Sequence, residues 1–252
     1  MPGSPFSPHR FLPVLLLLLL GGACAAPAAS AQAQRSVPDT MAQRLAACTS
    51  CHGSATAPPA ADPAGERRYY PRIAGKPAGY LYNQLLNFRE GRRQYPLMSW
   101  MVEHLSDDYL REISDYFAGE HLPVAVLARA SLPAAELERG RQLVTRGDAA
   151  LKVPACIACH GERLTGALPA IPGLVGLPRD YINAQFGAWR TGARRAHAPD
   201  CMDTIAQRLS LSDVSAVSAW LASEPLPADP APARAVPRPL PLACGSAPEG
   251  RP

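Results

Sequence analysis

The chain has 252 residues, a formal net charge of +4 at pH 7 and 18% charged residues. Such a small positive charge argues against a nucleic-acid-binding protein, because contacts to phosphates need a dense basic surface. The length is sufficient for two small domains.

The N-terminus, residues 1–33, has the layout of a secretory signal peptide. A basic residue precedes an apolar segment at residues 11–20, and A-x-A-like cleavage sites follow at 29–31 and 31–33. The apolar segment is shorter than the roughly 20 residues that a transmembrane helix needs. Processing as a lipoprotein at Cys24 is the alternative, although the residues before this cysteine fit a lipobox poorly.

This signal predicts export to the periplasm, an oxidising compartment where thiols pair unless another group holds them. No later segment of the sequence is long and apolar enough to span a membrane, so a soluble mature protein is expected, with peripheral membrane association left open. Of the seven cysteines, Cys24 leaves with the signal, four lie in two short motifs, and Cys201 and Cys244 remain.

The first half of the mature chain is expected to be mostly helical. Residues 38–47 and 78–90 read as helices, and Gly91 suits the end of the second one. Ser106 is a predicted N-cap, because its hydroxyl and the acidic residues after it stabilise the start of a helix. That helix is expected to end at Gly119.

The second half follows the same pattern. A helix is expected at residues 134–146, before the second cysteine motif, and another is expected to open at Ser212 and Asp213. Strand-like alternation is nearly absent, so the predicted fold class is all-α. The proline-rich tail, residues 224–252, cannot build a core and is expected to be extended or poorly ordered.

Two long segments of the chain match each other. YPRIAGKPAGYLYNQLLNFREGRR, from Tyr70, matches IPGLVGLPRDYINAQFGAWRTGAR, from Ile171, at a constant offset of 101 residues. The chain is therefore predicted to hold two copies of one helical unit, residues 37–121 and 134–223. The matched pairs are Pro71/Pro172, Gly75/Gly176, Pro77/Pro178, Tyr80/Tyr181, Gln84/Gln185, Arg89/Arg190, Gly91/Gly192 and Arg93/Arg194.

Each unit contains one C-x-x-C-H motif, CTSCHG or CIACHG. A zinc site needs its two cysteine pairs close together in sequence, and these pairs are 108 residues apart. A thioredoxin-like redox pair needs a βαβ context, which the helical pattern does not provide. The remaining interpretation is covalent haem, with thioether bonds from both cysteines and the histidine on the iron. The motif residues are Cys48, Cys51, His52, Cys156, Cys159 and His160.

A methionine occurs at a matching place in both units. Met98 and Met202 each lie after the arginine-rich turn and before the next predicted helix. Core packing is the ordinary role of a methionine, but the repeated position favours these two as axial ligands of the irons. Met101 competes in the first unit, but it matches Ile205 and is therefore assigned to packing.

These motifs, the blocks after PRIAG and PGLVG, and the phrases MSWMVEHLS and MDTIAQRLS resemble dihaem cytochromes c of the cytochrome c4 type. The resemblance covers residues 40–223. It implies two class I cytochrome c domains, two covalently bound haem c groups with His/Met iron, and electron transfer in the periplasm. It also implies that the carbonyl groups of Pro71 and Pro172 accept hydrogen bonds from the motif histidines.

Six arginines are candidates for contacts with haem propionates or acidic partners. The equally supported alternative is that each one simply lies in solvent at the end of a helix. They are Arg89, Arg92, Arg93, Arg190, Arg194 and Arg195. Cys201, directly before Met202, departs from the family pattern. A disulfide between Cys201 and Cys244 is expected, with the tail laid over the second haem. The alternatives are that Cys201 itself binds iron, or that the nearby His197 does.

Two functions stay open. The leading one is a periplasmic electron carrier between respiratory partners, such as a membrane cytochrome complex and a terminal oxidase, because His/Met iron has no open position for a substrate. The alternative is a dihaem oxidoreductase, or the electron-transfer subunit of a periplasmic dehydrogenase, as in dihaem thiosulfate dehydrogenases. Redox proteins are the expected partners, and neither a small-molecule substrate nor a nucleic acid is expected.

Overall fold

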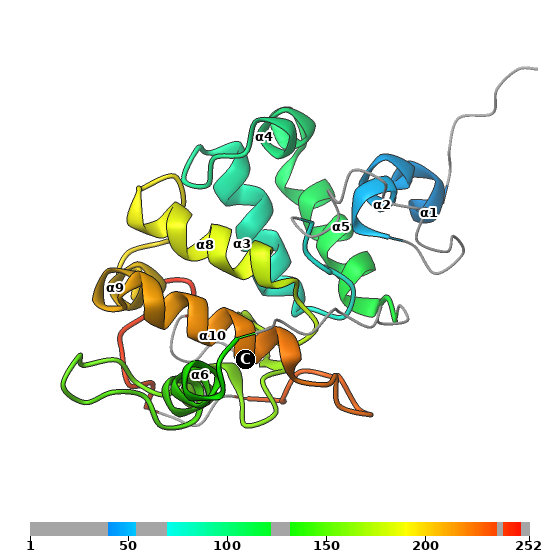
Figure 1. Ribbon diagram of the computed structural model, residues 1–252. Coiled ribbons are helices and arrows are strands. Elements are labelled where there is room, and N and C mark those ends of the chain that lie inside the picture. Colours follow the sequence, from blue (N-terminus) through cyan, green and yellow to red (C-terminus); the bar gives the residue numbers. More distant parts are fainter. Residues whose placement is uncertain (1–39, 54–69, 122–131, 236–238, 248–252) are drawn as a thin grey trace, which may run out of the picture. The chain divides into compact units, whose positions relative to one another are not determined.

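The computed structural model describes residues 40–53, 70–121, 132–235 and 239–247 (Figure 1). The predicted signal peptide and the loop after the first cysteine motif lie outside these residues. All described residues belong to one compact unit of the chain, Pro38–Pro252. Within the described ranges, no helix is long and apolar enough to cross a membrane.

The first unit begins with a helix that its own side chains cap. Thr40 and Gln43 form a capping box, in which each side chain accepts a hydrogen bond from the backbone of the other. The expected helix over residues 38–47 has different bounds: it starts at Met41, breaks at Leu45 and continues through the cysteine motif. The helices described in this unit are α1 (Met41–Arg44), α2 (Ala46–His52), α3 (Ala78–Arg89), α4 (Pro96–Val102) and α5 (Asp107–Gly119).

Serine caps start the last helix of each unit. Ser106 caps α5 as predicted, and its Oγ accepts a hydrogen bond from Tyr109 N at 3.2 Å. The helix expected to open at Ser212 is capped by Ser210 instead, because Ser210 and Asp213 form a reciprocal capping box. The helices of the second unit are α6 (Ala134–Arg146), α7 (Ile157–His160), α8 (Arg179–Arg190), α9 (Cys201–Arg208) and α10 (Leu211–Ser223).

A two-stranded sheet lies between α7 and α8, where the sequence pattern predicted no strand. β1 (Gly166–Ala167) pairs with β2 (Ile171–Pro172) in antiparallel register. Strands of two residues are too short to show an alternating pattern in the sequence. The sheet contacts α7 and so brings Pro172 to the second motif.

Helix packing builds a core in each unit. In the first unit α3 packs on α5, and Leu110 at the centre of this contact is fully buried. In the second unit α10 packs on both α6 and α8. The backbones of α6 and α10 approach so closely that a Cβ at Gly140 would lie 2.2 Å from the carbonyl oxygen of Ala216.

The sequence predicted an extended or poorly ordered tail; in its described parts the tail has no helix and packs on the second unit. Ala233 N donates to Gly166 O at 2.9 Å, and Ala233 O accepts from Leu168 N at 2.8 Å. Leu240 packs against the buried Ile171. The open edge of β1 supplies hydrogen-bond partners for the backbone of the tail. These bonds fix the tail in place although it has no helix or core of its own.

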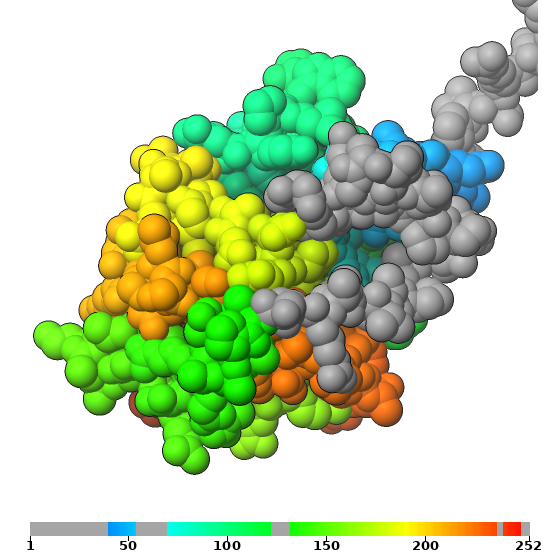
Figure 2. Space-filling model, in the orientation of Figure 1, coloured from blue at the N-terminus to red at the C-terminus, as the bar shows by residue number. Residues whose placement is uncertain are grey.

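The two units are joined by polar residues that match each other in the repeat. Arg93 donates to Gln185 Oε1 at 2.8 Å and to the Tyr181 hydroxyl at 3.1 Å. Arg194 donates in the opposite direction, to Gln84 Oε1 at 3.1 Å. Backbone hydrogen bonds also cross here, and Figure 2 shows the green segment before α4 against the yellow segment after α8.

Candidate functional site

The second motif opens onto an apolar cavity of about 170 Å³. Cys156 is the N-cap of α7, and Cys159 lies within this helix. Both side chains line the cavity together with His160. Burial raises the pKa of the Cys156 thiol to about 12. This thiol is therefore neutral at physiological pH, and the pocket around it favours an apolar group.

His160 is oriented by the backbone of β2. Its Nδ1 donates to Pro172 O at 2.7 Å, which fixes the ring and leaves Nε2 as the nitrogen for a metal. His160 is only 8% exposed. Burial lowers its pKa, the Pro172 hydrogen bond raises it, and the charge of Lys76 lowers it further. The ring is therefore held in the neutral form that ligates iron.

Met202 lines the same cavity as His160, as the repeat predicted. It lies in the first turn of α9, which Asp200 caps by accepting a hydrogen bond from Asp203 N at 3.1 Å. Asp200 also accepts from Ala196 N at 2.7 Å and so ties the loop before the helix to its start. Two thiols, an imidazole and a thioether around one apolar cavity fit a covalently attached haem with two axial ligands.

The first motif shows the same arrangement of its histidine. His52 Nδ1 donates to Pro71 O at 3.0 Å, which is the counterpart of the bond in the second unit. Cys48 and Met98 both pack against the core of the first unit. Met101 packs against that core as well, so packing alone does not separate the two methionines. The hydrogen bonds of the two motif histidines confirm the predicted role of Pro71 and Pro172, whose carbonyl groups accept them.

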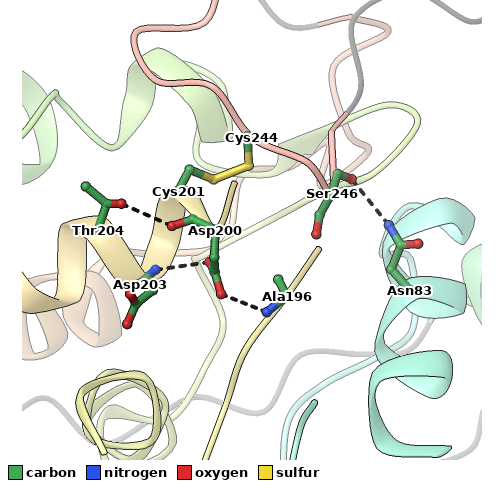
Figure 3. The surroundings of a disulfide bond; sticks show 8 residues. All are labelled: Asn83, Ala196, Asp200, Cys201, Asp203, Thr204, Cys244 and Ser246. Atoms are coloured by element: carbon green, nitrogen blue, oxygen red, sulfur yellow. Dashed lines mark hydrogen bonds between the residues drawn. A yellow bond between two sulfur atoms is a disulfide. The ribbon is translucent and has the colours of Figure 1, made fainter. Parts of the chain in front are cut away.

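Cys201 and Cys244 form a disulfide with Cα atoms 5.0 Å apart, as expected (Figure 3). Cys201 is therefore not available as a free thiolate, and the alternative that it binds iron is wrong. The bond closes a loop with a sequence separation of 43 residues. In the chain-entropy model a loop of this size stabilises the fold by about 4 kcal/mol.

The disulfide fixes the tail as one wall of the second cavity. Leu240, Leu242 and Cys244 of the tail line the cavity with the motif residues. Gly245 N donates to Pro199 O at 2.9 Å, and Asn83 of α3 donates to Ser246 O at 3.3 Å (Figure 3). The expectation that the tail lies over the second site is confirmed for these residues.

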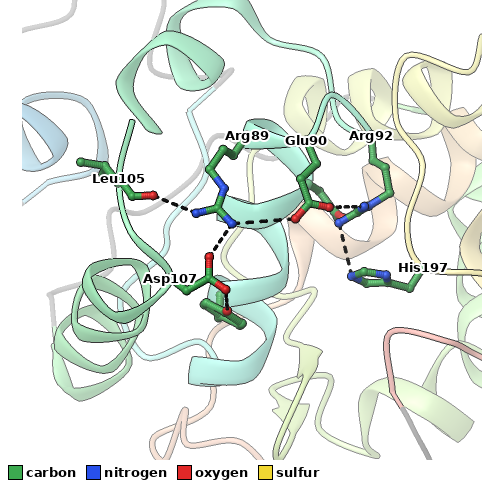
Figure 4. A network of polar contacts seen from close by, with 8 residues as sticks. Arg89, Glu90, Arg92, Leu105, Asp107 and His197 are labelled. Atoms are coloured by element: carbon green, nitrogen blue, oxygen red, sulfur yellow. Dashed lines mark hydrogen bonds and ion pairs between the residues drawn. The ribbon is translucent and has the colours of Figure 1, made fainter. Parts of the chain in front are cut away.

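Two of the six predicted arginines hold helices in place. Arg89 donates to Leu105 O at 2.8 Å and pairs with Asp107 at the start of α5 (Figure 4). Arg190 donates to Leu209 O at 2.7 Å, which is the matching bond in the second unit. These two arginines therefore set the position of the helix that follows each methionine.

The remaining arginines lie at the joint between the units. Arg92 binds Glu90 and lies 3.4 Å from His197 Nε2, which places His197 beside a guanidinium (Figure 4). Arg195 N donates to Arg92 O at 2.7 Å. Arg93 and Arg194 form the buried joint described above. Their partners, Gln84 and Gln185, were not predicted to have a function. The matching positions of these two residues in the repeat were a signal that could have indicated one.

Among the residues with described positions, no group of three His, Cys, Asp or Glu side chains is placed to hold a metal ion. The second cavity is lined instead by one histidine, one methionine and a pair of cysteines. This set suits iron in a porphyrin better than a bare ion, because the porphyrin itself supplies four ligands.

Comparison with known proteins identifies similar sequences, although no family model matches the chain. The chain is 36% identical over 187 residues to the thiosulfate dehydrogenase electron acceptor of Thiomonas intermedia, which covers 72% of this chain and 80% of the relative. It is 31% identical over 180 residues to cytochrome c4 of Pseudomonas aeruginosa, which covers 71% of this chain and 84% of the relative.

The chain also resembles a solved structure. The thiosulfate dehydrogenase TsdBA from Marichromatium purpuratum matches it with a TM-score of 0.59 and 32% sequence identity. The match covers 71% of this chain and 36% of that longer chain. The similarity therefore extends over the two repeated units but over only part of the other protein.

Proposed function

Because the chain belongs to the family of dihaem cytochromes c of the c4 type, we propose that it is a periplasmic carrier that accepts electrons from a thiosulfate dehydrogenase. The resemblance and the predicted fold class are confirmed: the chain is an all-α protein with two cytochrome c domains and two covalently bound haem c groups. It is an electron-transfer cytochrome rather than an enzyme.

The proposed domains are residues 37–121 and 134–223, followed by the tail at 224–252 and preceded by a cleaved signal at 1–33. Each domain holds one haem through its C-x-x-C-H motif and one methionine. The proposed ligands are Cys48, Cys51, His52 and Met98 for the first haem, and Cys156, Cys159, His160 and Met202 for the second.

One observation carries this proposal: His160 and Met202 line a single apolar cavity with Cys156 and Cys159. A bound haem c supplies a one-electron couple, and a thioether ligand favours its reduced form. Pro172 orients His160 through the hydrogen bond at 2.7 Å. Met202 and the tail residues Leu240 and Leu242 form part of the apolar wall of this cavity.

The partner and the compartment are supported by separate features. The relative from Thiomonas intermedia is named as the electron acceptor of thiosulfate dehydrogenase. The sequence of residues 1–33 predicts export, and the disulfide between Cys201 and Cys244 suits an oxidising compartment. Electrons received there pass on to a membrane acceptor, for which a terminal oxidase is the proposed example.

The experiment is reduction of the purified holoprotein by thiosulfate in the presence of a purified thiosulfate dehydrogenase. Absorption of the haems is followed in a stopped-flow instrument. We expect full reduction of both haems, and no reduction when either thiosulfate or the enzyme is omitted. Subsequent mixing with oxidase-containing membranes should restore the oxidised spectrum in the presence of oxygen.

A different result would contradict the proposed partner. Holoprotein that dithionite reduces fully, but that the enzyme and thiosulfate leave oxidised, is a carrier for another donor. Turnover of thiosulfate by the holoprotein alone, with an artificial electron acceptor, would contradict the carrier function itself.

A further inference from the structure

Lys76 is a buried cation of the first unit that reaches into the second. The residue is 9% exposed, and its Nζ donates to Gly173 O at 2.9 Å. It lines the same cavity as Cys156, Cys159 and His160. A charge from one domain therefore lies at the wall of the proposed haem site of the other.

The hydrogen bond of Lys76 is directly next to the one that orients the iron ligand. Gly173 follows Pro172, whose carbonyl oxygen accepts from His160 Nδ1 at 2.7 Å. This backbone is tightly packed, since a Cβ at Gly173 would lie 2.7 Å from Thr165 O. Lys76 and His160 are thus held by two adjacent carbonyl groups of one rigid segment.

Lys76 carries its charge at neutral pH. Burial lowers its pKa to about 8, Tyr181 raises it and Arg72 lowers it, so the ammonium form predominates below that value. In the described part of the chain, no carboxylate forms an ion pair with Lys76. A charge in a low-dielectric interior acts on its neighbours more strongly than a surface charge, which water and salt screen.

The repeat shows that this charge is present in one unit only. At the offset of 101 residues, the counterpart of Lys76 is Leu177. Leu177 is 6% exposed and belongs to the apolar core of the second unit. The lysine therefore breaks the symmetry of an otherwise matched segment, GKPAGY against GLPRDY.

We propose that Lys76 raises the reduction potential of the second haem through its positive charge, and affects the first haem less. This rests on the proposed function, because it requires a haem on the second motif. Oxidation of haem iron adds one positive charge, and a buried cation nearby makes that addition less favourable. The charge of Lys76 therefore favours the reduced form of the second haem.

The test replaces each of the two lysines of the chain, Lys76 and Lys152, in the holoprotein. Redox potentials of both haems are measured by spectroelectrochemistry at pH 6.5, where Lys76 is charged. We expect Lys76→Met to lower the potential of the second haem, and Lys76→Arg to keep it near the wild-type value. Lys152→Met is the matched control, because Lys152 is exposed, and it should move neither potential.

Met202→His identifies which wave belongs to the second haem, since an imidazole in place of a thioether lowers the potential of that haem. A purely structural effect of losing the hydrogen bond to Gly173 has the opposite sign. It would loosen the hold of Pro172 on His160, make the imidazole a weaker donor and raise the potential.

Three outcomes would overturn the role of Lys76: unchanged potentials in Lys76→Met, a rise instead of a fall, or an equal fall in Lys76→Arg. In each of these cases two haems per chain would still be bound, so the proposed function would stand. Failure of the proposed function is a separate result, namely wild-type protein with fewer than two covalent haems.

Discussion

Each candidate site contains a histidine whose Nδ1 is held by a proline carbonyl. The bond is 3.0 Å from His52 to Pro71 and 2.7 Å from His160 to Pro172. Both rings are thereby left with Nε2 for iron, and neither can rotate without losing a buried hydrogen bond. The second ligand that we propose for each iron is a methionine, and in the first unit both Met98 and Met101 pack against the same core.

Replacing the methionines with leucine tests these ligands, because the change keeps the volume and removes the sulfur. We expect Met98→Leu and Met202→Leu each to open one iron, so that the reduced protein binds one CO per chain. Each should also lower the potential of the affected haem, since a thioether favours the reduced form. CO difference spectra and a redox titration measure both effects.

Met101→Leu is the control for this experiment and should leave both irons closed. If Met101→Leu binds CO and Met98→Leu does not, Met101 is the ligand of the first haem and the repeat alignment misassigns it.

The C-x-x-C-H spacing predicted the motif residues, because covalent attachment needs fixed residue types at fixed spacing, and the resemblance to cytochromes of the c4 type implied the role of the two prolines. The roles of Arg93 and Arg194 could not be predicted, since an arginine that joins two units has the same local sequence as one at a solvated helix end. Lys76 was missed for a related reason: its partner, Gly173, is 97 residues away and contributes only a backbone carbonyl.

Of the glycines in the described helices, Gly140 permits the closest backbone approach, which occurs where α6 crosses α10. A Cβ at Gly140 would lie 2.2 Å from Ala216 O and 2.9 Å from Trp220 Cβ. The same crossing is strengthened by Arg139, which pairs with Asp213 of α10 at 2.8 Å and with Asp148 at 3.0 Å. The two helices of this crossing are therefore joined both by close packing and by an ion pair.

Gly140→Ala should destabilise the holoprotein by about 1–3 kcal/mol, the usual range for overpacking a buried contact. Gly187→Ala is the matched control, because Gly187 also lies in a helix but has no atom within 4 Å of its added Cβ. That change should be neutral or stabilise the protein by about 0.5–1 kcal/mol. Chemical denaturation followed by circular dichroism measures both, and equal effects of the two changes would contradict the close crossing.

Helix positions could be predicted well wherever an apolar stripe and a serine cap coincide, as in α5. The break at Leu45 and the earlier cap at Ser210 could not, because the sequence offers competing caps within a few residues. The disulfide and the position of the described tail over the second site were expected, but its backbone pairing with β1 was not. Its order comes from the edge of β1 and from a disulfide, and neither leaves a periodic pattern in a proline-rich sequence.

Over the whole molecule, the repeat predicts two equal units, whereas the described second site is built from more than its own unit. Lys76, Tyr80 and Asn83 of the first unit line its cavity, and so do Leu240 and Leu242 of the tail. The matched arginines of the joint hold these parts together. The two haems are therefore expected to differ in potential and in access to water, although the ligands proposed for them are of the same types.

Each repeated unit is proposed to attach one haem through its own motif. The most direct measurement is mass spectrometry of the intact mature protein, followed by peptide mapping, after expression in a host with cytochrome c maturation. We predict two haem masses added to the chain, one on the peptide with Cys48 and Cys51 and one on the peptide with Cys156 and Cys159. A chain with a single haem, with both haems on one motif, or with free thiols in either motif would contradict the account.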